Sequence, residues 1–345
     1  MLLLAAVACA FAADTSRRVQ LRLDTSEADA VLAILARQNA GQSVATGDWE
    51  RLFATEPYQR LKRREADMHR DFTDDDFKKF VLSDATLKRS AELRRTLAEW
   101  KQADLNAAAQ RVLAYLPAES VIRAKVFPVI KPQSNSFVFD TETDPTIFLY
   151  LDPAEGQARF EIIVAHELHH IGLSSNSKAY DQAIASLPAG PRAAAEWMGA
   201  FGEGVAMLAA AGGPDIDPVA TYTTELQAEW KRDMQNFNAD LDRVQQFFLD
   251  ASSGRLSSQD EVRGQAMKFF GSIGPWYSLG YRMAVLVEQR YGRAALIQCM
   301  LDFRKLPASY NRVAAEINAR GKQHLALWSP ELLKAVDAQP VPQAR

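Results

Sequence analysis

Residues 160–171 read F-E-I-I-V-A-H-E-L-H-H-I, and the rest of the chain is best interpreted outward from this stretch. Its apolar residues fall on almost every side of a helix, which is typical of a helix buried in the protein core. His166, Glu167 and His170 satisfy the pattern H-E-x-x-H. At about 100° per residue, the two outer histidines lie within about 40° of each other on one helix face. We therefore expect His166 and His170 to bind one zinc ion.

Glu167 lies beside the two histidines, where a general base must stand to take a proton from a metal-bound water. Burying two histidines and a glutamate without partners is costly, and a metal relieves that cost. The alternative interpretation is that these are core histidines satisfied by hydrogen bonds. His169 points away from Glu167, and we expect it to pack in the core or to support a ligand by a hydrogen bond.

A catalytic zinc needs three protein ligands and one open position, so a third ligand must come from elsewhere. The metzincin pattern H-E-x-x-H-x-x-G-x-x-H is excluded, because Leu173 and Asn176 occupy its last two defining positions. Glu203, within G-E-G-V-A at 202–206, is our candidate, since a lone carboxylate among small and apolar residues is costly unless it is paired or binds a metal. Glu196, two turns earlier in a more polar setting, is the rival ligand.

On these two windows the chain resembles the gluzincins, zinc peptidases with two histidines from H-E-x-x-H and a glutamate from a downstream helix. Within them it is most similar to a bacterial secreted family of zinc-dependent peptidases of uncharacterised function. The resemblance covers about residues 120–295. One difference is Met207, which stands where thermolysin-like members have an aspartate four positions after the ligand glutamate.

The resemblance implies zinc as the cofactor, a peptide or protein as the substrate, and a zincin-like catalytic fold. It also implies that Glu167 takes a proton from the attacking water and passes it to the leaving amine. The developing oxyanion usually needs a further donor. Tyr277 is the candidate, because it stands at the start of an expected helix, and Tyr281, one turn later, is a second candidate. The alternative is that both tyrosines are core residues whose hydroxyls are satisfied by hydrogen bonds.

The predicted fold class is α+β and predominantly α-helical, with a small β-sheet next to the H-E-x-x-H helix. The sheet is expected from short β-rich runs at 121–130, 136–139 and 147–151. Four helical segments are expected after it, at 154–173, 192–211, 222–249 and 275–292. We predict an N-terminal helical region at 14–118, a zincin-like metallopeptidase domain at 119–338 and a disordered tail at 339–345.

Composition excludes several classes of protein. The 345 residues carry 40 Lys and Arg against 43 Asp and Glu, a net charge of −3 that argues against nucleic-acid binding through bulk positive charge. The basic run at 60–64 is followed by acidic residues, so we interpret it as an ion-paired helix face. Two cysteines cannot form a disulfide framework, and Cys299 is expected to be a buried core residue.

Residues 1–13 are apolar and end in small residues, which is typical of a secretory signal peptide although the positively charged start is missing. We expect a secreted or periplasmic protein without a transmembrane segment. Ala6-Val7-Ala8-Cys9 also resembles a lipobox, in which Cys9 would carry a lipid anchor to the outer membrane. An apolar start to a cytosolic protein is the third alternative.

The leading functional hypothesis is therefore a zinc metallopeptidase of gluzincin type. The alternative is a catalytically inactive zinc-binding relative that acts as a binding or scaffold protein, and the complete H-E-x-x-H counts against it. A third interpretation is a helical interaction protein that binds no metal.

Overall fold

The computed structural model describes residues 18–321 and 324–342, which are mostly helical and contain one four-stranded sheet. This confirms the predominantly helical fold with a small sheet. The predicted signal peptide, Cys9 and residues 343–345 lie outside the described residues. Within the described ranges, no helix combines the length and the apolar character needed to cross a membrane.

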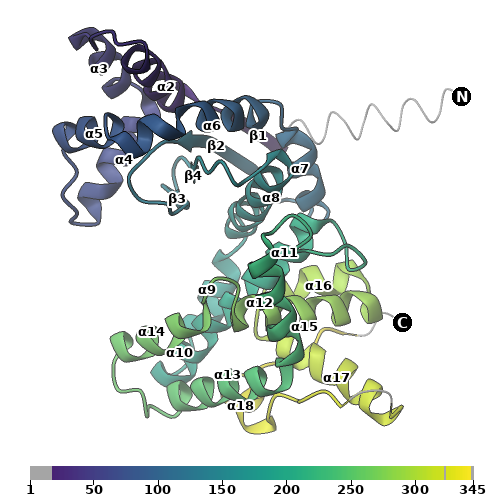
Figure 1. Ribbon diagram of the computed structural model, residues 1–345. Helices are drawn as coiled ribbons and strands as arrows, with labels where there is room; N and C mark the ends of the chain where they lie inside the picture. Colours follow the sequence, from purple (N-terminus) through teal and green to yellow (C-terminus); the bar gives the residue numbers. More distant parts are fainter. Residues whose placement is uncertain (1–17, 322–323, 343–345) are drawn as a thin grey trace, which may run out of the picture. The chain divides into compact units, whose positions relative to one another are not determined.

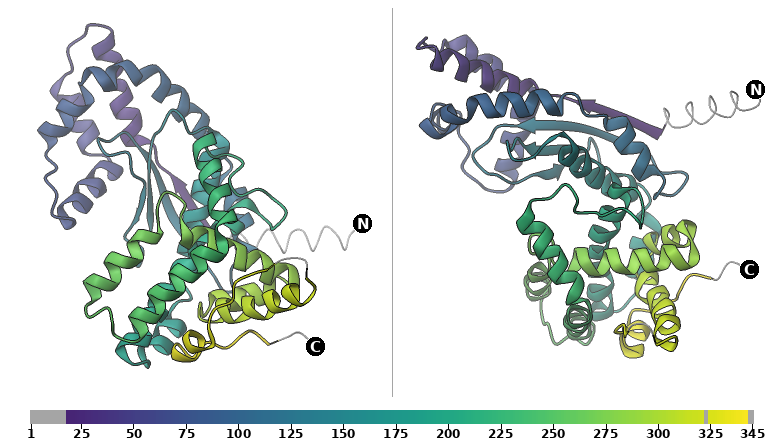
Figure 2. Two further views of the ribbon diagram at one scale, coloured as in Figure 1. Left: turned by 60° about the horizontal axis from the view of Figure 1, so that its bottom comes forward. Right: turned by 45° about the vertical axis from the view of Figure 1, so that its right-hand side comes forward.

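The chain divides into two compact units, and each is described by itself. The first contains residues 121–171 and the described part of 1–109, and the second contains residues 110–120 and the described part of 172–345. Figures 1 and 2 show that the strands all belong to the first unit, whereas the second is built from helices. The predicted domain boundary at 118/119 differs from this division, because the sheet groups with the N-terminal helices.

The elements up to the H-E-x-x-H helix are β1 (Val19–Leu23), α2 (Ser26–Asn39), α3 (Thr46–Phe53), α4 (Glu56–Asp67), α5 (Asp74–Val81), α6 (Asp84–Trp100), α7 (Leu105–Leu113), β2 (Ile122–Val129), β3 (Phe137–Phe139), β4 (Thr146–Tyr150) and α8 (Gln157–Ser174). The elements after it are α9 (Lys178–Ala185), α10 (Ala189–Met198), η1 (Gly199–Phe201), α11 (Gly202–Ala211), α12 (Thr224–Gln235), α13 (Phe237–Ser252), α14 (Gln259–Ala266), η2 (Met267–Phe269), α15 (Pro275–Tyr291), α16 (Arg293–Met300), α17 (Lys305–Ala319) and α18 (Pro330–Ala335).

The sheet has the strand order β1-β2-β4-β3. β1, β2 and β4 run parallel, and the short edge strand β3 is antiparallel to β4. Three of the strands were predicted at nearly these positions, which confirms that part of the interpretation. Because parallel strands end at the same edge, α2 and α8 both start shortly after that edge, where β1 and β4 end.

β1 is a strand that the prediction of an N-terminal helical region at 14–118 did not include. Its residues alternate between partly buried and exposed, and it pairs in parallel with β2, so that Leu21 lies opposite Ala124. The strand has only five residues, and its partner lies about a hundred positions further along the chain. Its pairing with β2 therefore stabilises a strand that has little intrinsic signal of its own.

One face of the sheet packs against α4. Leu61 of α4 joins Phe127, Val129 and Phe148 in a buried cluster, and the Phe127 and Phe148 rings meet edge to face at 5.2 Å. Burial of these large apolar side chains is the main force that holds α4 on the sheet. The ion-paired interpretation of residues 60–64 is confirmed, with one difference: Arg60 is buried.

Arg60 pairs with two carboxylates of the turn before β4. Its Nη1 atom lies 2.6 Å from Asp144 Oδ2, and its Nη2 atom lies 2.8 Å from Asp140 Oδ2. Lys62 pairs with Asp74 at 2.7 Å. A buried guanidinium needs this degree of pairing, because removing one partner would leave an uncompensated charge.

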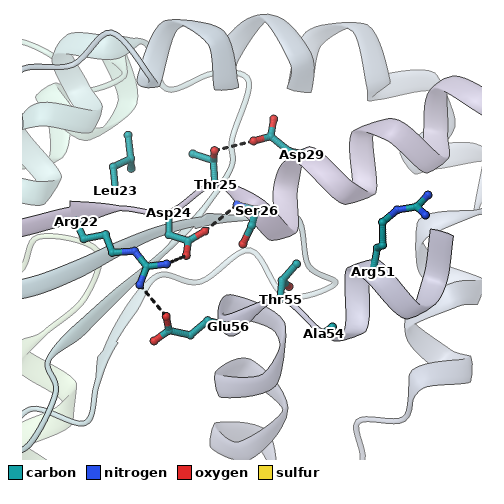
Figure 3. Close-up of a pocket in the computed structure, with 10 residues that line it drawn as sticks. All are labelled: Arg22, Leu23, Asp24, Thr25, Ser26, Asp29, Arg51, Ala54, Thr55 and Glu56. Atoms are coloured by element: carbon teal, nitrogen blue, oxygen red, sulfur yellow. Dashed lines mark hydrogen bonds and ion pairs between the residues drawn. The ribbon is translucent and has the colours of Figure 1, made fainter. Parts of the chain in front are cut away.

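A polar cavity of about 680 Å³ lies at the carboxyl end of β1, where the chain enters α2 (Figure 3). Arg22 pairs with Asp24 at 2.6 Å and with Glu56 at 3.1 Å. Asp24 also accepts the backbone N–H of Ser26 at 2.9 Å, and the Thr25 hydroxyl donates to Asp29 at 2.7 Å. These charged groups therefore satisfy one another and fix the turn between strand and helix.

The second unit is organised around an aromatic core. Trp276 at the start of α15 is fully buried, and its ring lies 5.5 Å from the ring of Phe201 and 5.8 Å from that of Phe248. Its indole N–H donates to the carbonyl oxygen of Ala266 at 2.9 Å. This gives a buried polar atom its required partner and anchors α15 against α13 and α14.

The amphipathic stripe at 222–249 is two helices, and the prediction of one continuous helix is wrong. α12 ends at Gln235 and α13 begins at Phe237, with Asn236 between them. The apolar spacing continues across the break, because Trp230 of α12 and Leu241 of α13 are both buried. A short polar residue such as Asn is favourable at a helix end, where apolar spacing alone gives no signal.

Residues 339–342 correct the prediction of a disordered tail for the part that is described. Val341 is buried, its N–H donates to Ser309 at 3.0 Å, and its carbonyl accepts from Arg312 at 2.8 Å. Both partners belong to α17, so contact with a distant helix orders a proline-rich segment. Cys299 is buried, as expected, and burial raises the pKa of its thiol to about 11.

Candidate metal centre

α8 positions the two predicted histidine ligands by its own geometry. His166 and His170 lie one turn apart, with their Nε2 atoms separated by 3.0 Å and their ring centroids by 4.7 Å at an interplanar angle of 75°. Both side chains are half-buried. Two imidazole nitrogens thus converge on one point beside the helix, as the spacing predicts.

This donor pair fits a zinc ion. Tetrahedral zinc with Zn–N bonds of about 2.0–2.1 Å separates two nitrogen ligands by about 3.3 Å, close to the distance between the Nε2 atoms. The same distance also allows one ring N–H to donate to the other ring nitrogen. Val164, Ala165 and Leu168 around the pair are fully buried, so the histidines occupy an apolar helix where a metal partner is favourable.

Glu167 and His169 lie on the same turn of α8. Glu167 is half-buried, which leaves its carboxylate able to reach solvent or a bound substrate. His169 is completely buried, and its ring centroid lies 6.2 Å from that of His170. Its predicted role in packing or in supporting a ligand stays a prediction.

In the second unit, Glu203 stands in the first turn of α11. Every other residue of that helix, from Gly202 to Ala211, is buried, whereas Glu203 is half-buried. The helix ends at Gly212, whose φ of +98° is the left-handed conformation that glycine adopts without strain. Glu203 is thus a single carboxylate at the edge of an otherwise apolar helix.

Glycines set the position of α11 against α15. A Cβ atom on Gly204 would overlap the backbone nitrogen of Tyr281 and the carbonyl oxygen of Tyr277, and one on Gly280 would overlap the carbonyl oxygen of Phe201. The two helices therefore cross with backbone against backbone. Of the two glycines that flank Glu203, Gly204 thus allows another helix to approach closely, as expected, and it fixes the start of α11 relative to the tyrosines of α15.

The predicted single helix over 192–211 is wrong. α10 ends at Met198, the 3-10 turn η1 follows, and α11 begins at Gly202. Glycines at both boundaries weaken the α-helix locally. Three residues at about 120° instead of 100° change the angle between Glu196 and Glu203 about the helix axis by roughly 60°, from about 20° on one side to about 40° on the other.

Glu196 itself is exposed on α10, unlike the half-buried Glu203. Both candidates for the third ligand thus belong to the second unit, and they differ in setting. An exposed carboxylate needs no metal to compensate it, whereas one embedded in an apolar helix gains more from an ion.

The two candidate tyrosines lie one turn apart on α15, which begins at Pro275 as predicted. Tyr281 is 8% exposed and its ring lies 5.3 Å from that of Trp230; burial, with Asp217 and Asp215 nearby, raises the pKa of its hydroxyl to about 12. Tyr277 is half-buried, with its ring 6.4 Å from that of Phe270. Tyr277 therefore has the more accessible ring of the two.

Comparison with known families gives one match. The family described as "Putative zinc dependent peptidase (DUF5700)" matches residues 49–319, which is more than half of the chain and includes both motif windows. The description indicates zinc dependence, in agreement with the cofactor predicted from the sequence. No curated protein and no solved structure matches the chain.

Proposed function

The chain belongs to the DUF5700 family, and from that premise we propose that it is a zinc metallopeptidase that hydrolyses peptide bonds. In this proposal His166, His170 and Glu203 hold the zinc ion and Glu167 is the general base. The observation that carries it is the pair of Nε2 atoms 3.0 Å apart on one helix, with a carboxylate on the residue after the first histidine.

The choice of Glu203 as the third ligand has two supports. Its carboxylate is the polar group of an otherwise buried helix. Together with His166 and His170 it also makes up a group of described side chains that could hold a metal ion, one ligand atom from each. Two imidazoles and one carboxylate are a donor set of catalytic zinc, which keeps a fourth position open.

Glu167 performs the proton transfers in this mechanism. Bound zinc would acidify a water and polarise the scissile carbonyl. The Glu167 carboxylate accepts the proton of the attacking water and then delivers it to the leaving amine nitrogen.

Tyr277 is the proposed donor to the developing oxyanion. A phenol hydroxyl can donate one hydrogen bond to the oxygen of a polarised carbonyl, and such a donor typically contributes about 10²–10³-fold to the rate. Gly204 contacts the backbone of Tyr277, so packing couples the position of this residue to the start of α11, where Glu203 lies.

The finer assignments belong to the proposal as well. They are the gluzincin type, a zincin-like fold for the catalytic part, and a peptide or protein substrate. We also propose a secreted or periplasmic location, with attachment to the outer membrane through a lipid on Cys9 as the alternative.

Comparing the wild type with Glu167→Gln tests the proposed function. Both proteins should contain one zinc per chain, and the variant should lose at least about 10²–10⁴-fold in peptide cleavage, the usual contribution of a general base. Bound zinc with no cleavage of any peptide library by the wild type would favour the inactive relative. Equal cleavage by the two proteins would show that the assigned mechanism is wrong.

A further inference from the structure

A cavity of about 500 Å³ opens on the second unit beside the start of α11. It is lined by Glu196 and Trp197 of α10, Gly199 and Ala200 of η1, and Phe270 after η2. The 3-10 turn that interrupts the predicted helix thus contributes part of its wall. A Cβ atom built on Gly199 meets no atom within 4 Å, so the cavity is open above this residue.

The chemistry of this cavity favours a cation. Its charged side chain is the Glu196 carboxylate, and two aromatic rings, Trp197 and Phe270, form the adjoining walls. The Trp197 ring stacks at 6.4 Å on the fully buried Trp276, which holds it in place. A carboxylate attracts an ammonium or guanidinium group by charge, and an aromatic ring adds a cation-π interaction to a cation that lies over its face.

The positive side chain nearest in sequence to Glu196 is engaged elsewhere. Arg192, one turn earlier on α10, donates from Nε and Nη2 to the carbonyl oxygen of Leu187 at 3.3 and 2.9 Å. Among the residues that the structure describes, no ion pair joins Glu196 to a basic side chain. Its carboxylate is therefore available to a positively charged ligand.

The cavity is close to the proposed site along the chain. Ala200 precedes Glu203 by three residues and Glu196 precedes it by seven, which correspond to about 5 and about 10–12 Å along the helices. Phe270 contacts Tyr277, with ring centroids 6.4 Å apart. An extended peptide advances about 3.3–3.6 Å per residue, so about three residues of a substrate span the same length as these helical segments.

We propose that the cavity formed by Glu196, Trp197, Gly199, Ala200 and Phe270 is a specificity subsite that binds a lysine or arginine side chain of the peptide substrate. The assignment of the cavity as a substrate subsite rests on the proposed peptidase function. It gives Glu196 the role of cation receptor and leaves Glu203 as the metal ligand.

Binding tests the subsite without requiring cleavage. The probes are capped alanine peptides with one lysine, moved position by position, and matched peptides with norleucine in its place. On the zinc-loaded full chain with Glu167→Gln, calorimetry should show the best lysine peptide binding about tenfold more tightly than its norleucine partner. Adding Glu196→Gln should remove this preference, and adding Gly199→Leu should weaken both peptides by filling the cavity.

Asp242→Asn is the matched control, since Asp242 is an exposed carboxylate on α13 that does not line the cavity. It should leave the lysine preference intact. A further set of probes consists of uncapped norleucine peptides, whose only positive charge is the free amino terminus. If they bind as tightly as the capped lysine peptides, the cavity recognises a chain terminus and the proposal is overturned.

Cleavage of the same peptides by the wild type separates the two proposals. Lysine-selective binding that depends on Glu196, without cleavage of any peptide, supports the subsite and contradicts the peptidase function. Cleavage with no difference between lysine and norleucine in either binding or kcat/KM supports the peptidase function and overturns the subsite.

Discussion

α8 of the first unit and α11 of the second are both apolar helices that carry candidate metal ligands, but they present them in different ways. On α8 the two ligands come from one helix, four residues apart, and the helix geometry alone brings their Nε2 atoms to 3.0 Å. On α11 there is one candidate ligand, Glu203, whose position depends on the crossing of Gly204 with the backbone of α15.

The comparison separates two parts of the proposed metal site. The histidine pair of α8, which we call the α8 half-site, is encoded locally, whereas the position of Glu203 requires tertiary packing. A two-histidine pair survives as long as α8 remains helical. The carboxylate reaches its place only when a second helix is packed at the right depth. Mutations should therefore affect the two regions differently, and the following predictions run from the largest expected effect to the smallest.

Replacing His166 by alanine should abolish stoichiometric zinc binding and all peptide cleavage, because one remaining histidine and a carboxylate no longer complete the set of three ligands. Zinc content by atomic emission should fall below about one tenth of the wild-type value after dialysis. The helix itself should persist, so far-ultraviolet circular dichroism serves as the control. Wild-type zinc content in this variant would contradict the assignment of the α8 half-site.

Replacing Glu203 by glutamine should weaken zinc binding by at least about 100-fold, more than loss of an outer hydrogen-bond partner usually costs. The parallel variant Glu196→Gln should retain wild-type affinity, since Glu196 is exposed. Competition with a chelator measures both affinities. The opposite ranking of the two variants would transfer the third ligand to α10.

Replacing Gly204 by alanine should destabilise the second unit by about 1–3 kcal/mol, because the added methyl group overlaps the backbone of α15. Gly199→Ala is the matched control: its Cβ meets open space, and it should be neutral or slightly stabilising. Denaturant unfolding compares the two. If Gly204→Ala is as stable as Gly199→Ala, α11 is not positioned by this crossing.

The smallest effect concerns pH and the first unit. Burial raises the pKa of Glu27 to about 8, against the opposing effects of the Ile130 N–H, which donates to its Oε2 atom at 3.0 Å, and of Lys131. The folded state then binds the proton more tightly than the unfolded state. This contribution to stability is complete below about pH 4.5 and is lost as the pH rises through about 8.

Two other groups with a shifted pKa affect the free energy of unfolding in different pH ranges. Burial lowers the pKa of Lys131 to about 8, which affects stability above that pH, and burial raises the pKa of Asp233 in the second unit to about 6. Between pH 6 and 8, Glu27 should therefore dominate, with a loss of about 1–2 kcal/mol in the free energy of unfolding. Glu27→Gln should flatten that slope in denaturant titrations; an unchanged slope would contradict the prediction.

The features that could be predicted from the sequence are the locally encoded ones, and the features that were missed depend on tertiary packing. The H-E-x-x-H helix, three strands and the start of α15 depend on patterns within a few residues, and the structure confirms them. β1 was missed because its pairing partner β2 is far along the chain, although alternation of Val19, Leu21 and Leu23 is a weak signal for it.

The remaining errors also arise from non-local contacts or from local breaks. The ordered part of the tail depends on Ser309 and Arg312 of α17. Apolar residues recur at helical spacing on both sides of η1 and of Asn236. The periodicity of the sequence therefore does not reveal that the helix is interrupted at these two places. The cavity around Trp197 and Phe270 joins residues more than seventy positions apart, and sequence spacing gives no indication of it.

The most direct test of the central claim is a crystal structure of the zinc-loaded protein with anomalous data collected at the zinc absorption edge. The account predicts one strong peak bound by Nε2 of His166, Nε2 of His170 and a carboxylate oxygen of Glu203, with Glu167 beside the open position. A peak bound by Glu196 instead of Glu203, a peak away from the two histidines, or no peak at full zinc saturation would contradict it.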